Sequence, residues 1–129
     1  MPRKKSEHLT PLELEIMKVL WETGPANVQT VLRHLNSGHA YTTVQTMLGV
    51  LHRKGKVTRR LKEKAYFYRP SVSRREVVGK AMSDLIERMF GGDAESLVMS
   101  LVEAKHITPE KLARLNQLVG EGERDEQDR

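Results

Sequence analysis

Hydrogen-bonding side chains recur on one side of a helix predicted over residues 41–55. At about 100° per residue, Val44 and Leu48 fall on a buried stripe that also takes in Met47 and Leu51. The other side is small, polar and basic, and comprises Thr42, Thr46, Gly49 and Arg53, flanked by Gln45 and Val50. The residues of this helix predicted to contact DNA are Thr42, Thr43, Gln45, Thr46 and Arg53, with Lys54 at its end. Hydroxyl and amide groups of this size can hydrogen-bond base edges without holding a helix away from the floor of a DNA groove. The pattern predicts a DNA-reading helix that ends at Gly55, a residue type that readily ends helices in the left-handed conformation.

A basic hairpin is predicted directly after this helix. Residues 57–61 and 65–68 are short runs rich in β-branched and aromatic side chains, joined by residues 62–64. The hairpin carries Arg59, Arg60, Lys62, Lys64 and Arg69. Cations on a hairpin beside a recognition helix would contact phosphates or enter the minor groove, and phosphate contacts position a protein without reading sequence.

Two further helices must hold these elements. Thr10, Pro11 and Glu13 form a capping box with proline in the first helical position, and Asn27 is a suitable cap for a second helix. Trp21 is expected to pack in the core. With the third helix they complete a helix-turn-helix, so residues 9–70 are predicted to be a winged-helix DNA-binding domain.

The rest of the chain reads as three more helices. Residues 91–92 break the first from the second, Thr108 opens the last, and that helix is expected to end at Gly120. About 45 helical residues are too few to bury so much apolar surface alone. Residues 71–119 are therefore predicted to form a dimerisation domain, although folding back on the winged domain is the alternative. The predicted interface residues are Val78, Met82, Leu85, Met89, Leu97, Leu101, Leu112 and Leu115.

Charge separates the same two regions. Residues 1–70 hold 13 Lys and Arg against 5 Asp and Glu, whereas residues 71–129 hold 9 against 12, which gives +8 and −3 and the net charge of +5. A basic reading domain joined to an assembly domain has this distribution. Residues 1–8 are predicted to be a basic arm, on DNA or merely solvated, and residues 120–129 a disordered acidic tail.

Several classes of function are disfavoured by composition. The chain has no cysteine, which excludes disulfides and thiolate metal sites and is consistent with a reducing cytoplasm. It has no apolar run long enough for membrane insertion and no secretory signal. His34 and His39 lack further ligands nearby, so no metal is expected. No catalytic constellation is evident, so we expect neither an enzyme nor a cofactor.

The chain resembles the penicillinase and methicillin-resistance repressor family of bacterial transcription regulators. The resemblance lies in LTPLELEIMKVLWETGPANV (residues 9–28), AYTTVQTMLGVLHRKG (40–55), AYFYRP (65–70) and, more loosely, SLVMSLVE (96–103). It implies a homodimeric repressor with two winged helices on a palindromic operator, and induction by a membrane sensor protease.

Two departures from the family pattern bear on this resemblance. Family members often carry base where this chain has Gly49 and Val50, which affects base-edge contacts at that turn. Inducible members are cut at an Asn-Phe bond in the middle C-terminal helix, and the aligned residues of that proteolytic site are Ser100 and Leu101 here. We therefore expect this bond to remain uncut and repression to be relieved by another route.

Two other functions fit the composition. One is a winged helix that binds proteins and no DNA. The other is a single-component ligand sensor, which would need a pocket among Met82, Leu85, Met89 and Met99.

Overall fold

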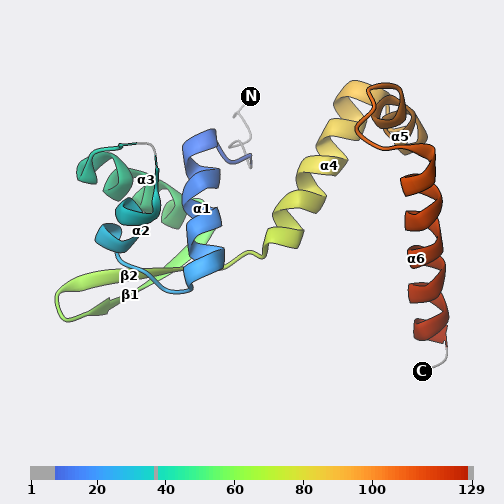
Figure 1. The fold of residues 1–129 in the computed structure, drawn as a ribbon. Coiled ribbons are helices and arrows are strands. Elements are labelled where there is room, and N and C mark those ends of the chain that lie inside the picture. The colour runs from blue at the N-terminus through green and yellow to red at the C-terminus, as the bar shows by residue number, and fades with distance from the viewer. Residues whose placement is uncertain (1–7, 37, 128–129) are drawn as a thin grey trace, which may run out of the picture. The chain divides into compact units, whose positions relative to one another are not determined.

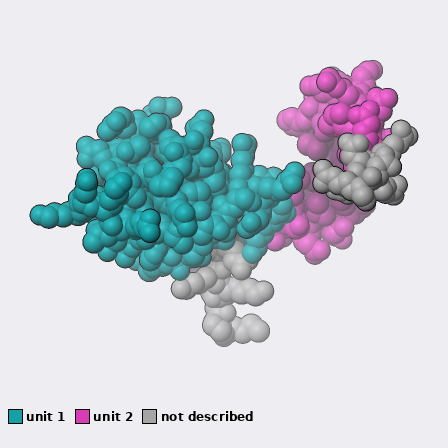
Figure 2. All heavy atoms as spheres, turned by 90° about the horizontal axis from the view of Figure 1, so that it is seen from below, with its two compact units in different colours: residues 1–81 teal, residues 82–129 magenta. Residues whose placement is uncertain are grey.

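The computed structural model describes residues 8–36 and 38–127. The chain divides into two compact units, which meet between Ala81 and Met82 (Figure 2). The predicted fold class, mainly α with a small β-wing, is confirmed. The elements in chain order are α1 (Pro11–Thr23), α2 (Val28–His34), α3 (Tyr41–Arg53), β1 (Val57–Lys62), β2 (Ala65–Pro70), α4 (Arg74–Phe90), α5 (Ala94–Glu103) and α6 (Pro109–Gln127), as Figure 1 shows.

The predicted caps form on α1 and α2. The Thr10 hydroxyl accepts from the Glu13 amide at 3.3 Å, and the Glu13 carboxylate accepts from the Thr10 amide at 3.3 Å. The Asn27 side chain accepts from the Thr30 amide at 2.9 Å. Each contact satisfies an amide that the first turn of a helix leaves without a partner.

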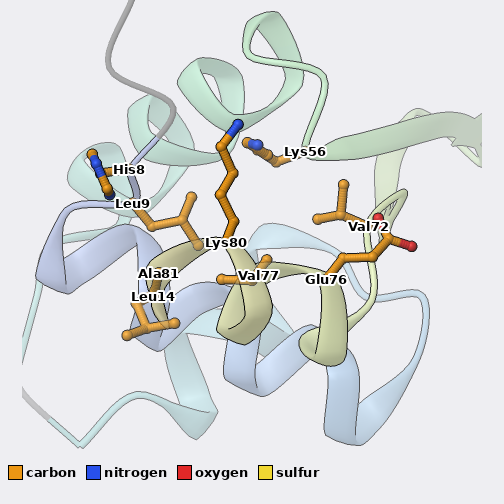
Figure 3. A pocket seen from close by; sticks show the side chains of 9 residues that line it. All are labelled: His8, Leu9, Leu14, Lys56, Val72, Glu76, Val77, Lys80 and Ala81. Atoms are coloured by element: carbon orange, nitrogen blue, oxygen red, sulfur yellow. The ribbon is translucent and has the colours of Figure 1, made fainter. Parts of the chain in front are cut away.

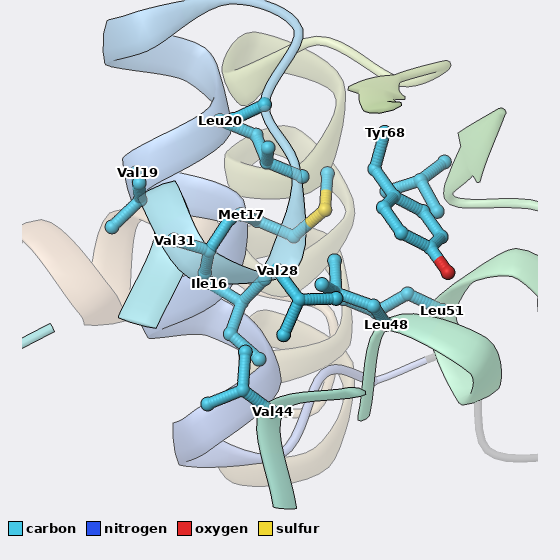
Figure 4. Packing of buried hydrophobic residues seen from close by; sticks show 12 residues of the cluster. Ile16, Met17, Val19, Leu20, Val28, Val31, Val44, Leu48, Leu51 and Tyr68 are labelled. Atoms are coloured by element: carbon cyan, nitrogen blue, oxygen red, sulfur yellow. The ribbon is translucent and has the colours of Figure 1, made fainter. Parts of the chain in front are cut away.

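One core holds the first unit together. It draws on α1, α2, α3 and both strands, as Figure 4 illustrates. The predicted stripe of α3 is buried at Val44, Leu48 and Leu51, and Met47 packs against the core. The buried apolar residues are Ile16, Met17, Val19, Leu20, Ala26, Val28, Val31, Val44, Leu48, Leu51, Val57 and Tyr68.

A third short stretch of chain pairs with the wing. Ala26 and Tyr68 form an antiparallel bridge in which the Ala26 amide donates to Tyr68 at 3.0 Å and the Tyr68 amide donates to Ala26 at 2.8 Å. This bridge fixes the turn between α1 and α2 to β2. The sequence did not predict it, since a one-residue bridge has no periodic pattern.

The segment after the wing is also fixed to the first unit. The Ser71 hydroxyl donates to the Gly55 carbonyl at 2.6 Å, and the Ser71 amide donates to the Lys56 carbonyl at 2.9 Å. Trp21 packs against the core as predicted, and its Nε1 donates to the Val72 carbonyl at 2.9 Å. The compact unit therefore runs on to Ala81, within α4, whereas the sequence placed the domain boundary at Pro70.

The second unit contains the end of α4 together with α5 and α6. Asp93 caps α5 as predicted, accepting from the Glu95 amide at 3.0 Å, and Thr108 caps α6 by accepting from the Lys111 amide at 3.2 Å. The predicted helix end at Gly120 is wrong, because α6 continues to Gln127 through most of the stretch expected to be a disordered tail. Glycine inside a helix costs only about 1 kcal/mol, so it does not end one by itself. Residues 1–7 of the predicted arm and residues 128–129 lie outside the described residues.

Candidate nucleic-acid interface

The polar side of α3 is presented to solvent. Its C-terminus closes at Gly55, whose φ is +76°, with the Gly55 amide bonded to the His52 carbonyl at 3.1 Å and the Lys56 amide to the Leu51 carbonyl at 2.9 Å. This is the left-handed helix end that the sequence predicted. The α3 side chains predicted to read bases, Thr42, Thr43, Gln45, Thr46 and Arg53, are all exposed.

Lys54 differs from the other predicted site residues because its ammonium group is held by a carboxylate. Its Nζ donates to both carboxylate oxygens of Glu13, at 3.0 and 2.9 Å. The Glu13 side chain is only 2% exposed, against 22% for Lys54. Burial raises the pKa of Glu13, but hydrogen bonds from Lys54 and Thr10 lower it, and the net pKa lies below the ordinary value. The pair thus joins the first turn of α1 to the end of α3.

Sequence reasoning gave Glu13 a capping role alone. A signal for its burial was present, because position 13 lies three and four residues before Ile16 and Met17 and so falls on the buried face of α1. A carboxylate on that face needs a cation, and the chain supplies Lys54 from a distant part of the sequence.

The wing divides its cations between two faces. In the β1–β2 register, Arg60 lies opposite Phe67, and Arg59 lies opposite Tyr68. Since side chains alternate along a strand, Arg60 and Lys62 share one face and Arg59 projects from the other. There the Arg59 guanidinium stacks over the Tyr66 ring, 4.2 Å from its centroid. The sequence analysis did not separate these cations by face and predicted one common role for them on DNA.

The turn of the wing is left-handed. Glu63 and Lys64 have φ angles of +51° and +67°. Two consecutive positive φ angles are typical of the turn that matches the twist of a two-residue hairpin, where Asn-Gly is preferred. The turn presents Lys64 at the tip of the wing, exposed to solvent.

Two hollows flank the wing. One, of about 660 Å³, is lined mainly by cations, and these are Arg59, Arg60, Lys62 and Arg69. The other, of about 240 Å³, lies between the start of α2, α3 and the wing, and its lining includes Gln29, Tyr41, Gln45, Lys64 and Tyr66. Gln29 and Tyr66 were missed at the sequence level, because only the fold brings them beside Tyr41.

The predicted interface residues of the C-terminal helices are poorly covered in the single chain. On α4, Val78, Met82, Leu85 and Met89 are exposed, and Met89 is 70% exposed. On α5, Leu97 and Leu101 are half-buried, as is Ser100. On α6, Leu112 and Leu115 are exposed.

Two kinds of site are absent from the described residues. No helix among them is long and apolar enough to cross a membrane. Nor do they contain a group of three or more histidine, aspartate and glutamate side chains placed to hold a metal ion.

Comparison with known proteins places these features in a family. The model of the penicillinase repressor family matches residues 9–121. The penicillinase repressor of Bacillus licheniformis is 26% identical over 120 residues, covering 92% of this chain and 94% of that protein. The methicillin resistance regulatory protein MecI of Staphylococcus aureus (strain N315) is 20% identical over 117 residues, covering 89% of this chain and 95% of that protein.

A solved structure agrees with the sequence match. The solution structure of the DNA-binding domain of the repressor BlaI superposes with a TM-score of 0.50 at 32% identity, covering 55% of this chain and 89% of that domain. The resemblance inferred from sequence is confirmed: this chain belongs to the penicillinase repressor family of winged-helix, DNA-binding transcriptional repressors.

Proposed function

We propose that the chain acts as a homodimer on a palindromic operator, with one winged helix on each half-site. The observation that carries this proposal is the apolar surface of the C-terminal helices. No residue is buried in α4 or α5, all of whose residues the structure describes, and α6 exposes Leu118 and Val119 as well as its predicted interface residues. Soluble monomers rarely expose apolar surface of this extent, and a second copy would cover it.

In the proposed complex, α3 contacts the base edges. Thr42, Thr43, Gln45, Thr46 and Arg53 would enter the major groove, with half-sites one or more turns apart at about 10 base pairs per turn. Gly49 supports a close approach of this helix to DNA. A Cβ atom added there meets nothing within 4 Å in the free chain, so packing within the chain does not require a glycine.

The wing would hold the DNA backbone. Arg59, from one face, and Arg60 with Lys62, from the other, would contact phosphates on either side of a minor groove, with Lys64 at the tip. Lys54 is assigned the structural task of fixing α3 to α1 through Glu13, and we propose no base contact for it.

Selection of genomic DNA by the purified protein tests the operator proposal. The selected sequences should share two inverted half-sites. Arg53→Ala or Thr46→Ala should then cost about 1–3 kcal/mol on that operator and relax its sequence preference. Lys18→Ala, which removes an exposed cation from α1, is the matched control and should leave the preference intact. Equal weakening on operator and random DNA would restrict the contact to the backbone.

Sedimentation of single-site variants tests the dimer. Leu85→Asp or Leu101→Asp should yield monomers, because pairing would bury an unpaired charge. Ser83→Asp adds the same charge at an exposed polar position of α4 and should remain dimeric. If Leu85→Asp and Leu101→Asp chains dimerise like the wild type, these helices do not form the interface.

A further inference from the structure

A half-open cavity of about 300 Å³ lies within the first unit, between the start of α1 and the first two turns of α4. Its walls are aliphatic, from Leu9, Leu14, Val72, Val77 and Ala81. This volume is at the lower end of those that take small molecules, and an aliphatic lining with a few polar groups is typical of such sites. The cavity differs from the one that the alternative ligand-sensor function would need, because none of Met82, Leu85, Met89 and Met99 lines it.

The rim of the cavity carries an excess of positive charge. Lys56 and Lys80 line it, against the single carboxylate of Glu76, and His8 completes the polar lining. In Figure 3 the two ammonium groups lie toward one end, and the Glu76 carboxylate points elsewhere. Lys80 and His8 already interact with other groups of the chain. Lys56 has no hydrogen bond or ion pair from its side chain to any described residue, so it is the cation available to an incoming anion.

The cavity wall is part of the link between the recognition helix and α4. Lys56 follows the left-handed end of α3, and its carbonyl accepts from the Ser71 amide at 2.9 Å. Val72, on the same wall, is held by Trp21 through its carbonyl. A ligand here would touch both the segment that ends α3 and the turns that begin α4. It would therefore bind some arrangements of the link between α3 and α4 more tightly than others. Such a difference in affinity couples the ligand site to the DNA-binding surface.

We propose that this cavity is an effector site for a small carboxylate with an apolar body. The carboxylate pairs with Lys56 and the apolar body packs on Leu9, Leu14 and Val77. Occupancy lowers operator affinity for two reasons. The ligand favours one arrangement of the segment that links α3 to α4, and its negative charge offsets the positive charge of Lys56 in the DNA-binding unit. Binding of the ligand is independent of the proposed function, whereas its effect on the operator rests on that function.

Three probes that share a six-carbon chain and differ in their terminal group test the site on the full-length chain. They are hexanoate, hexan-1-ol and hexylammonium. In methyl NMR titrations, hexanoate should give saturable shifts at Leu9, Leu14 and Val77, and bind more tightly than the other two. Lys56→Glu should weaken hexanoate by about tenfold and strengthen hexylammonium, since reversal replaces an attraction with a repulsion. Lys18→Glu makes the same charge change on α1 away from the cavity and should alter neither.

A variant that fills the cavity gives a second readout. Ala81→Phe should abolish the methyl shifts, and Ala81→Ser should keep them. No saturable shift with any probe, or a preference for hexanoate that survives Lys56→Glu, overturns the site.

Operator binding with and without hexanoate tests the coupling. Wild-type affinity should fall on saturation with hexanoate, and the ratio of affinities should return to one in Ala81→Phe. Hexanoate binding at the cavity with an unchanged operator affinity would overturn the regulatory part alone. If the chain selects no operator at all, the proposed function fails, and the NMR titrations still decide whether the site exists.

Discussion

Lys54 and Glu13 form a two-point ion pair, with Nζ 3.0 and 2.9 Å from the carboxylate oxygens, that ties the end of the recognition helix to the first turn of α1. The two partners differ in their access to water, because Glu13 is 2% exposed and Lys54 is 22% exposed. Removing one partner of a buried pair is costly mainly through the charge left behind. The pair is therefore expected to respond asymmetrically to mutation.

Lys54→Met should destabilise the fold more than Glu13→Gln. The first variant leaves a buried carboxylate without its cation, at about 3 kcal/mol. The second leaves a partly exposed ammonium that water can reach, at about 1–2 kcal/mol. Urea unfolding measures both, with Glu15→Gln, an exposed carboxylate of the same helix, as the control near zero. An equal loss in the free energy of unfolding for the two variants would contradict the prediction that the carboxylate is more deeply buried than the ammonium.

Acid should remove the contribution of this pair. The pKa of Glu13 is lowered from 4.5, so the unfolded chain binds a proton more readily than the folded chain does. The stabilisation is present above the unfolded value and is lost as pH falls through the lowered pKa of the folded state. The stability gap between wild type and Glu13→Gln, followed by urea unfolding from about pH 7 to about pH 3, should narrow in that acidic window. A gap that stays constant to the lowest pH would show that the carboxylate charge contributes nothing.

The two faces of the wing should contribute separately to DNA binding. Arg59→Ala and Arg60→Ala should each reduce the slope of log affinity against log salt by about 0.9 units per protomer, and the double variant by about twice that, if each arginine contacts one phosphate. Additivity is expected if the two arginines, which lie on opposite faces of the wing, contact different phosphates. Fluorescence anisotropy across a salt series measures the slopes. If one variant alone accounts for the whole double-variant change, only one face meets DNA.

The turn of the wing allows stability to be separated from binding. Lys64→Gly should stabilise the fold by about 1 kcal/mol, because glycine adopts a positive φ without the steric cost that an L side chain incurs. The same change removes a cation from the wing tip and should weaken DNA binding.

Lys105→Gly is the matched control for this prediction. Lys105 has a φ of +62° at the left-handed end of α5, so the change should give a similar gain in stability. It should leave the salt slope of DNA binding unchanged. A Lys64→Gly chain that is more stable and binds DNA as well as the wild type would remove Lys64 from the interface.

Local features of this fold could be predicted from sequence, and contacts between distant segments could not. The caps at Thr10, Asn27 and Asp93 and the left-handed end at Gly55 depend on residues within one helical turn, so their residue types are sufficient evidence. The Glu13–Lys54 pair instead depends on the packing of α3 against α1. No spacing in the sequence encodes which cation reaches that carboxylate.

The same distinction applies to the candidate site. The exposed side of α3 follows from periodicity alone, and the division of Arg59 from Arg60 could have been read from strand alternation. Tyr66, Gln29 and the bridge between Ala26 and Tyr68 become visible only once the chain has folded. The prediction that the last helix ends at Gly120 failed for another reason. A glycine was taken to end the helix, although its cost inside a helix is only about 1 kcal/mol and α6 continues to Gln127.

The bond between Ser100 and Leu101 should remain intact in the cell. Both residues are half-buried in α5. The Ser100 carbonyl, which a protease would attack, accepts from the Ala104 amide at 2.9 Å, and the Leu101 carbonyl accepts from the His106 amide at 2.9 Å. Cleavage requires local opening of this helix end. The pair also lacks the Asn and Phe that the resemblance associates with cleavage.

Mass spectrometry of the protein recovered after cell-wall antibiotic stress decides the matter, with transcripts measured from the genes beside the selected operators. We expect intact chain together with derepressed genes, which would place induction in a step other than proteolysis at this bond. A Ser100→Asn, Leu101→Phe chain, treated in parallel, shows whether residue type or helix closure protects the site. Wild-type fragments that end at Ser100 and begin at Leu101 would overturn the prediction. They would make loss of the linked half-sites the route of release, since a cut within α5 would separate α6 from the winged helix and weaken the pairing that joins two winged helices on one operator.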